Sequence, residues 1–211
     1  MCPSFPLLDA LSRPYRGTRI HFGAQDMFYE DGAHTGEVSP RMVKDTKAKY
    51  VIVGHAERRA LGETDEVVAR KVGAALDVKL TPIVAVGETE RDKDGRYFDE
   101  LRTSVLDSLA LVDEKTLKKI VIAYEPVWAI GASLAPDARV IRETIIFIRK
   151  VLAERFDRKE ALKARIIYGG AVTPETAPEL ITDSGANGFL LGRAAVDAEQ
   201  FIAVVNAYHA K

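Results

Sequence analysis

The chain has 211 residues with 30 basic and 31 acidic side chains, a formal net charge of −1. This balance leaves no basic excess that would indicate nucleic-acid binding, and no apolar run approaches the ~18 residues of a membrane-spanning helix. With 47% hydrophobic residues, one cysteine (Cys2) and no signal-peptide pattern, the sequence favours one globular domain over residues 1–211 in the reducing cytoplasm.

Apolar, β-branched runs alternate with helical patterns along the chain. The predicted strands, in chain order, are residues 18–23, 50–53, 80–86, 119–124, 165–168 and 188–191. Continuous apolar runs of this kind are typical of parallel strands that are buried on both faces. Helices are predicted at residues 7–11, 65–76 and 197–208, and the caps Ser39, Asp137 and Thr173 predict further helix starts. The alternation predicts one α/β domain with a parallel sheet.

A carboxylate stands at the end of the predicted strand at residues 119–124. Glu125 is followed by Pro126 and then by small residues up to Gly131, as a moving loop would require. A glutamate in this setting is a candidate proton-transfer base with a lid attached. An arbitrary Glu-Pro dipeptide, however, is more often a salt-bridged strand end.

Three other predicted strand ends carry residues suited to chemistry. The strand at residues 50–53 is followed by Gly-His-Ala-Glu-Arg-Arg, in which His55 can donate or accept protons, although a lone histidine is more often a hydrogen-bonded core residue. The strands at residues 165–168 and 188–191 are each followed by glycine, where backbone N–H groups can approach a phosphate closely. Such glycines also make simple tight turns.

Together these segments resemble the triosephosphate isomerase family. The resemblance is carried by Glu-Pro-Val-Trp-Ala-Ile-Gly at residues 125–131, Gly-His-Ala-Glu-Arg-Arg at 54–59 and Tyr-Gly-Gly at 168–170, and it extends from residue 2 to about residue 208. It implies a TIM (β/α)8 barrel and an aldose–ketose isomerase of a small sugar phosphate. It also implies that no metal or organic cofactor is needed.

The resemblance assigns roles to particular residues. Triosephosphate isomerase is itself a standard example of a glutamate base paired with a neutral histidine, so this pairing comes from the family. Glu125 would move a proton between neighbouring carbons, His55 would polarise the carbonyl oxygen, and Glu57 matches a glutamate near that histidine. The phosphate would be bound by backbone amides at four positions: Gly131, Ala171, Gly192 and Arg193.

The number of strand–helix units is lower than the resemblance requires. A (β/α)8 barrel typically has about 250 residues, whereas about six complete units are predicted here and residues 1–6 resemble only the end of the family's second strand. The family's Asn-x-Lys motif is also missing, because Asn187 and Asn206 have no such context. We therefore expect an N-terminally truncated barrel. In one alternative, the sequence starts too late. An opened barrel favours this alternative, because it would leave two unpaired apolar strand edges that are prone to aggregate. In the other, the short chain is real and another copy covers those edges.

Several departures from the family pattern cluster around the predicted substrate. The lid continues as Ala-Ser-Leu-Ala-Pro at residues 132–136 instead of beginning with Thr-Gly-Lys, Ala171 and Ala56 replace serines, Arg193 replaces a glycine, and residues 58–63 are one residue short. These changes resemble isomerases of four-carbon ketose phosphates such as erythrulose phosphate. Arg193 either contacts a phosphate or longer substrate or points outward to a carboxylate, and both interpretations stay open.

The segment at residues 23–40 resembles the family's interdigitating third loop. In relatives its threonine, here Thr35, reaches into the active site of the partner subunit, which implies a C2 homodimer. The alternative is an ordinary mobile surface loop. Asp26 stands where an asparagine is common, which weakens the expectation of that contact.

Three classes of function follow. An isomerase is the leading class. Another phosphate-binding barrel enzyme, such as an epimerase, would share the fold but not the Glu125 and His55 motifs. The third class is a non-catalytic or weakly active relative that retains phosphate binding or assembly, and the missing lysine motif is the feature that favours it.

Overall fold

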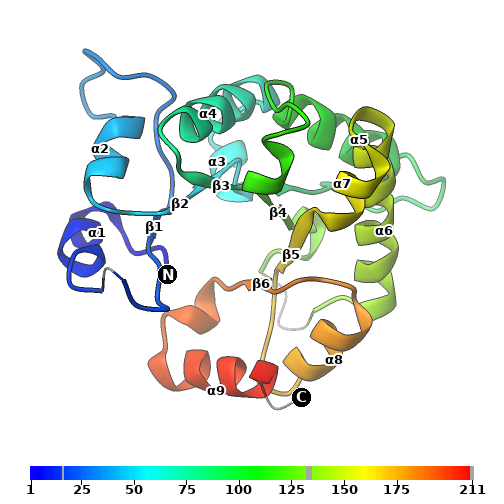
Figure 1. Ribbon diagram of the computed structural model, residues 1–211. Coiled ribbons are helices and arrows are strands. Elements are labelled where there is room, and N and C mark those ends of the chain that lie inside the picture. Colours follow the sequence, from blue (N-terminus) through cyan, green and yellow to red (C-terminus); the bar gives the residue numbers. More distant parts are fainter. Residues whose placement is uncertain (16, 132–134, 210–211) are drawn as a thin grey trace. The chain divides into compact units, whose positions relative to one another are not determined.

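The structure is a computed structural model that describes residues 1–15, 17–131 and 135–209 (Figure 1). It divides into two compact units, one formed by Met1–Ala85 with Leu106–Val121 and the other by Val86–Val105 with Ile122–Lys211. Within the described ranges, no helix is both long enough and apolar enough to cross a membrane.

The first unit is built on three parallel strands. β1 (Gly23–Ala24) pairs with β2 (Tyr50–Val53), and β2 pairs with β3 (Thr81–Val86), with Gly23 opposite Tyr50 and Tyr50 opposite Thr81. The helices of this unit are α1 (Phe5–Ser12), α2 (Pro40–Asp45), α3 (Ala56–Ala60) and α4 (Asp65–Asp77). The predicted strand at residues 50–53 and the predicted helix at residues 65–76 are confirmed.

The predicted strand at residues 18–23 is wrong over most of its length, because β1 begins only at Gly23. The Thr18 hydroxyl donates to the Tyr15 carbonyl at 2.8 Å, and the Ile20 N–H donates back to that hydroxyl at 3.1 Å. Local side-chain bonds of this kind compete with a strand ladder. The α-amino group of Met1 donates to the His21 carbonyl at 2.7 Å, and Gly23 N–H donates to Met1 at 3.0 Å, so Met1 lies beside this edge.

The second unit holds most of β4 (Val121–Tyr124), together with β5 (Arg165–Gly169) and β6 (Phe189–Leu190). In the sheet β4 neighbours β5, and β5 pairs in parallel with β6, with Gly169 opposite Leu190. In the described part of this unit, the α-helices that belong wholly to it are α6 (Ala138–Arg155), α7 (Arg158–Lys163), α8 (Ala177–Asp183) and α9 (Ala198–His209). The helix α5 (Tyr97–Ser108) begins in this unit and ends in the other.

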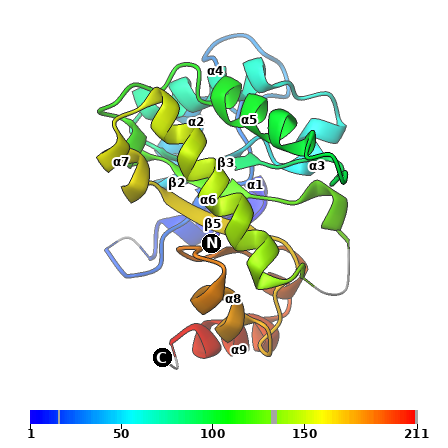
Figure 2. The ribbon, with the colours of Figure 1, turned by 90° about the vertical axis from the view of Figure 1, so that its right-hand side faces the viewer.

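Helix α6 supplies much of the second unit's core, and α7 packs beside it (Figure 2). Its apolar stripe consists of Ile141, Ile145, Ile148 and Leu152, each at most 2% exposed and spaced three or four residues apart. The Asp137 carboxylate caps this helix by accepting the Arg139 N–H at 2.7 Å, as the sequence predicts.

The predicted helix start at Thr173 is wrong, because α8 begins at Ala177. A helix running from Thr173 would need Pro178 in its second turn, where a residue without an N–H leaves a carbonyl unpaired. Instead, Thr173 N–H donates to the Thr176 hydroxyl at 3.0 Å in a turn, and Pro178 falls in the first turn of α8. The predicted last helix is confirmed as α9.

Candidate active site

His55 stands at the junction of β2 and α3. Gly54 ends the strand with a left-handed φ of +71°, and His55 is the N-cap of α3. Its Nδ1 accepts the backbone N–H of Glu57 at 3.3 Å. This contact makes Nδ1 a hydrogen-bond acceptor and orients the ring at the start of α3.

The Glu57 carboxylate is a second neighbour of the same ring nitrogen. Its Oε2 lies 3.8 Å from His55 Nδ1, and its side chain is 84% exposed. An ion pair would require a protonated Nδ1, in conflict with the N–H that Nδ1 accepts. The N–H contact is the shorter of the two, and a solvated carboxylate at 3.8 Å adds little to it.

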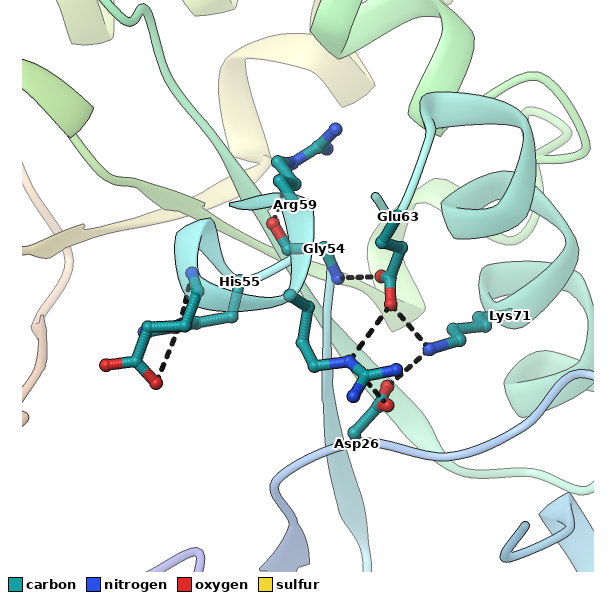
Figure 3. Close-up of polar contacts among 8 residues, drawn as sticks. Asp26, Gly54, His55, Arg59, Glu63 and Lys71 are labelled. Atoms are coloured by element: carbon teal, nitrogen blue, oxygen red, sulfur yellow. Dashed lines mark hydrogen bonds and ion pairs between the residues drawn. The ribbon is translucent and has the colours of Figure 1, made fainter. Parts of the chain in front are cut away.

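The peptide groups of Gly54 are held from both sides (Figure 3). Its N–H donates to Glu63 Oε1 at 2.9 Å, and its carbonyl accepts Arg59 Nε–H at 2.7 Å. A Cβ on Gly54 would lie 3.0 Å from the Arg59 guanidinium and 3.1 Å from the Ala85 carbonyl. The backbone immediately before His55 is therefore tightly confined.

Four charged side chains form an ion cluster behind this glycine: Asp26, Arg58, Glu63 and Lys71. Lys71 Nζ lies 2.6 Å from both Asp26 Oδ1 and Glu63 Oε2, and the Lys71 and Glu63 side chains are each 3% exposed. Figure 3 shows the side chains of Asp26, Glu63 and Lys71 converging. Buried charges require such pairing, so the cluster's geometry is tightly constrained.

Glu125 directly follows β4 and is buried, with 5% of its surface exposed. Its N–H donates to the Val86 carbonyl at 2.8 Å, which continues the strand ladder by one residue. Two glycines make room for it. A Cβ on Gly169 would lie 2.8 Å from Glu125 Cγ, and one on Gly87 would lie 1.8 Å from the Glu125 carbonyl oxygen. At Gly87 the backbone oxygen excludes any side chain, and at Gly169 any Cβ would require the Glu125 side chain to shift.

The loop after Glu125 is anchored by a second buried glutamate. Glu88 is fully buried, and its Oε1 accepts the Tyr124 hydroxyl at 2.9 Å and the Trp128 Nε1–H at 2.8 Å. Val127 N–H donates to the Glu88 carbonyl at 3.1 Å. Burial and the Glu88 carboxylate raise the pKa of Tyr124, so it remains a neutral donor. The base of the predicted lid is thus fixed through Glu88.

Tyr168 lies in β5, directly before the Gly169–Gly170 pair. A Cβ on Gly170 would lie 2.3 Å from the Tyr168 hydroxyl, and that buried hydroxyl has no hydrogen-bond partner among the described residues. Burial raises the pKa of Tyr168 to about 12. The glycine pair therefore accommodates both the Glu125 side chain and the tyrosine.

The predicted phosphate-binding positions lie in loops of the second unit. Ala171 follows β5 and Gly192 follows β6, and because these strands are parallel both loops leave the same edge of the sheet. Gly192 and Arg193 are exposed, and Gly192 precedes the short 3-10 helix Arg193–Ala195. Gly131 is exposed with a φ of +86°. The predicted lid segment at residues 132–134 lies outside the described residues.

Thr35 is exposed in the loop between β1 and α2. The loop is closed at its base by Phe28 N–H donating to the Val38 carbonyl at 2.8 Å. The Phe28 ring also packs on His34, with centroids 4.5 Å apart. In the part of the chain that the structure describes, no group of three His, Cys, Asp or Glu residues could hold a metal ion.

Comparison with known proteins decides the family. The protein-family model described as "TIM: Triosephosphate isomerase" matches residues 1–208 of this chain. The triosephosphate isomerase of Thermoanaerobacter sp. (strain X514) is 42% identical over 207 residues, covering 97% of this chain and 84% of the relative. That of Carboxydothermus hydrogenoformans is 44% identical over 208 residues, covering 97% and 83%. The chain belongs to the triosephosphate isomerase family.

A solved structure supports the same conclusion. The crystal structure of triosephosphate isomerase from Bartonella henselae matches with a TM-score of 0.88 at 34% identity, covering 99% of this chain and 85% of that chain. The predicted α/β TIM-barrel fold is confirmed, and so is the predicted triosephosphate isomerase-type enzyme.

Within this family member, the predicted site residues are divided between the two compact units. His55, Glu57 and Thr35 belong to the first unit, and Glu125 and the four phosphate-binding positions belong to the second. Glu63, Lys71 and Glu88 were missed by the sequence analysis. One signal for Lys71 was available, because it falls on the buried face of α4 beside Val72.

Proposed function

We propose that the chain isomerises a small sugar phosphate by proton transfer through an enediolate, with Glu125 as base and His55 as proton donor. The observation that carries the proposal is the buried Glu125 carboxylate after β4, confined by Gly169, in a member of an isomerase family. Confinement supports this role because a general base must be held within reach of one particular proton.

The reaction uses two groups in turn. The Glu125 carboxylate takes a proton from the carbon beside the substrate carbonyl, and the C–H electron pair becomes the double bond of an enediolate. His55 Nε2–H donates to the oxygen on which negative charge develops, which stabilises the transition state. The hydroxyl proton then passes by way of His55 from the oxygen that becomes the new carbonyl to the oxygen that becomes the hydroxyl, and the Glu125 carboxyl gives a proton to the neighbouring carbon, which completes the change from ketose to aldose. Glu57 contributes its backbone N–H, which holds His55 Nδ1.

The substrate phosphate is proposed to bind backbone amides at Gly131, Ala171, Gly192 and Arg193. Ala171 and Gly192 follow adjacent parallel strands, and Gly192 and Arg193 are accessible to solvent. Amides at such loops bind phosphate oxygens well because the N–H groups can converge on one anion. The resemblance to the family supplies these four positions.

We propose a four-carbon ketose phosphate, such as erythrulose phosphate, as the preferred substrate over dihydroxyacetone phosphate. The substituted lid at residues 132–136 and Arg193 in place of glycine support this choice. The test is kcat/KM for both ketoses in the parent and in Arg193→Gly. We expect the variant to shift the ratio toward the triose, and an unchanged ratio would count against a role for Arg193 in substrate choice.

A weakly active or non-catalytic relative is the second candidate, favoured by one observation. No Asn-x-Lys motif occurs in the 211 residues, and no lysine has the matching context. Losing a charged stabiliser of an oxyanion costs on the order of 10²–10³ in rate. We therefore propose that a polypeptide of these residues turns over slowly, and that fusing about 40 N-terminal residues of a relative, the shortfall from a typical barrel, restores the rate.

We also propose a cytoplasmic homodimer in which Thr35 contacts the partner subunit. The exposed loop closed at Phe28 and Val38 supports this proposal. Sedimentation of the parent and Thr35→Arg tests it, since a charged bulky residue at a tight contact should shift the protein toward monomer. A monomeric parent contradicts the proposal.

The function is tested by incubating the parent and the fused form with each ketose phosphate and following the products by NMR. Appearance of the corresponding aldose phosphate supports an isomerase. Formation of an epimer supports the other class of barrel enzyme. No turnover by either form contradicts the proposed function, and turnover by the fused form alone supports the second candidate for the 211-residue chain.

A further inference from the structure

The peptide before His55 is held by side chains whose own positions are fixed by buried charge. Gly54 N–H donates to Glu63 Oε1 at 2.9 Å, while the Gly54 carbonyl accepts Arg59 Nε–H at 2.7 Å. We propose that Glu63 is a positioning residue: through Gly54 it sets the placement of the His55 ring. This inference rests on the proposed role of His55 as proton donor.

The Glu63 carboxylate is occupied on both oxygens. Oε1 accepts a hydrogen bond from the Gly54 N–H, and Oε2 lies 2.6 Å from Lys71 Nζ and 3.4 Å from Arg58 Nε. Only 3% of the Glu63 side chain is exposed, so water does not compete for these contacts. A carboxylate restrained in this way cannot rotate away from Gly54 without leaving a buried cation short of a partner.

The rest of the ion cluster restrains Glu63 in turn. Lys71, 3% exposed, also contacts Asp26 Oδ1 at 2.6 Å, and Asp26 Oδ2 lies 3.1 Å from Arg58 Nε. Two cations and two anions therefore close a ring of contacts with no net charge. Such a ring gives the Gly54 acceptor a defined position, because each member fixes two others.

The other side of Gly54 is equally constrained. Arg59 contacts Asp65 Oδ1 at 2.6 Å and donates to the Ala85 carbonyl and the Ser108 hydroxyl, each at 3.1 Å. The guanidinium is therefore a rigid donor to the Gly54 carbonyl. With both polar groups of Gly54 fixed, the N-cap geometry that directs Glu57 N–H to His55 Nδ1 is fixed as well.

Removing the hydrogen bond between Glu63 and Gly54 should change the tautomer of His55. If the ion cluster had a purely structural role, the same change would lower only the stability of the protein. The readout is the tautomer of His55 by ¹⁵N NMR of histidine-labelled protein, in which His55→Gln assigns its signals among the four histidines. We expect the parent to show the Nε2–H tautomer alone, and Glu63→Ala to show a mixture. In whichever form turns over, kcat should fall by ~10² with little change in KM, as for a misplaced catalytic group.

Lys71→Met is the matched control. It removes a buried charge from the same cluster but leaves the hydrogen bond between Glu63 and Gly54. We expect this variant to lose stability and to keep the Nε2–H tautomer. If Lys71→Met and Glu63→Ala perturb the His55 signals equally, or if Glu63→Ala leaves them unchanged, the positioning role is refuted.

A second pair keeps the test decisive if Glu63→Ala does not fold. In the Lys71→Met background, Glu63→Gln retains an oxygen for Gly54 N–H and Glu63→Met does not. We expect the glutamine variant to keep the parent tautomer and the methionine variant to lose it, and identical spectra would refute the proposal. The tautomer is measured without turnover, so an inactive parent counts against the proposed function and leaves this test intact.

Discussion

His55 and Glu125 are both placed after a parallel strand, but the two surroundings differ in kind. Near His55, charged side chains hydrogen-bond to the backbone: Glu63 accepts the Gly54 N–H, and Arg59 donates to the Gly54 carbonyl. Near Glu125, two glycines leave the space that the residue occupies, since a Cβ on Gly169 or Gly87 would collide with Glu125.

The difference indicates how each region can fail. A buried charge cluster loses stability when one member is neutralised, because the remaining members keep an uncompensated charge. A glycine-lined space loses its function when any atom is added, because a packed interior has little room to yield. The predictions below test each mode separately.

The largest effect is expected at Glu125. Glu125→Gln keeps the shape of the side chain and removes the base, so turnover should fall by ~10²–10⁴, the range for general-base catalysis. Substrate affinity should change far less. The measurement is kcat and KM for parent and variant proteins of the same length, on whichever sugar phosphate is turned over. Full activity in the variant would remove Glu125 from the mechanism.

Lys71→Met should lower the free energy of unfolding by about 3–5 kcal/mol, because it breaks a buried ion pair from one side. The control is Arg70→Met, whose exposed partner Glu30 is 47% accessible. An exposed pair is worth at most about 1 kcal/mol. Urea unfolding of the two variants measures the contrast, and equal losses would mean that the cluster is no more than a surface network.

Gly169→Ala tests the steric confinement of Glu125. The new Cβ would lie 2.8 Å from Glu125 Cγ, so the carboxylate must move, and we expect kcat to fall by ~10² as for a misplacement of about 1 Å. Gly188→Ala is the control, because its Cβ would make an ordinary 3.6 Å contact with Ile167. Equal activity in the two variants would show that Glu125 tolerates displacement.

The smallest effect concerns the buried hydroxyl of Tyr168. Its pKa is raised to about 12 by burial, against about 10 in an unfolded chain. The native state therefore holds its proton to higher pH than the unfolded state. The resulting stability is fully present below pH ~10 and is lost as the pH rises toward about 12.

Tyr168→Phe should remove part of that alkaline loss. At pH 7 its unfolding free energy should stay within about 1 kcal/mol of the parent, since the hydroxyl has no partner among the described residues. Urea unfolding at pH 7 and pH 10.5 gives the two values. Tyr124 adds a loss of the same sign, because its pKa is also raised. An identical alkaline slope in parent and variant would assign the whole effect to other groups.

The sequence predicts local features well and tertiary ones poorly. The strand at residues 50–53, the Ser39 and Asp137 caps and the last helix follow from apolar runs and capping chemistry. The first strand was predicted wrongly because the Thr18 hydroxyl bonds locally. The Thr173 helix start was wrong because Pro178 restricts where a helix can begin.

In the candidate site, too, local features are predictable from the sequence and tertiary contacts are not. Glu125 and His55 stand out because each follows an apolar run within a short motif. The ion cluster does not, since Lys71 meets Asp26 across 45 residues and no local pattern encodes that meeting. Its one local trace is a lysine on the buried face of α4. Positioning groups that act through the backbone require the folded structure to be seen.

The central claim is that Glu125 moves a carbon-bound proton. The most direct measurement is isomerisation of the ketose phosphate in D₂O, followed by NMR. The account predicts that deuterium enters the carbon beside the carbonyl in the presence of the parent, or of its fused form, and that Glu125→Gln slows this exchange together with turnover. Exchange and turnover at undiminished rates in Glu125→Gln would contradict it.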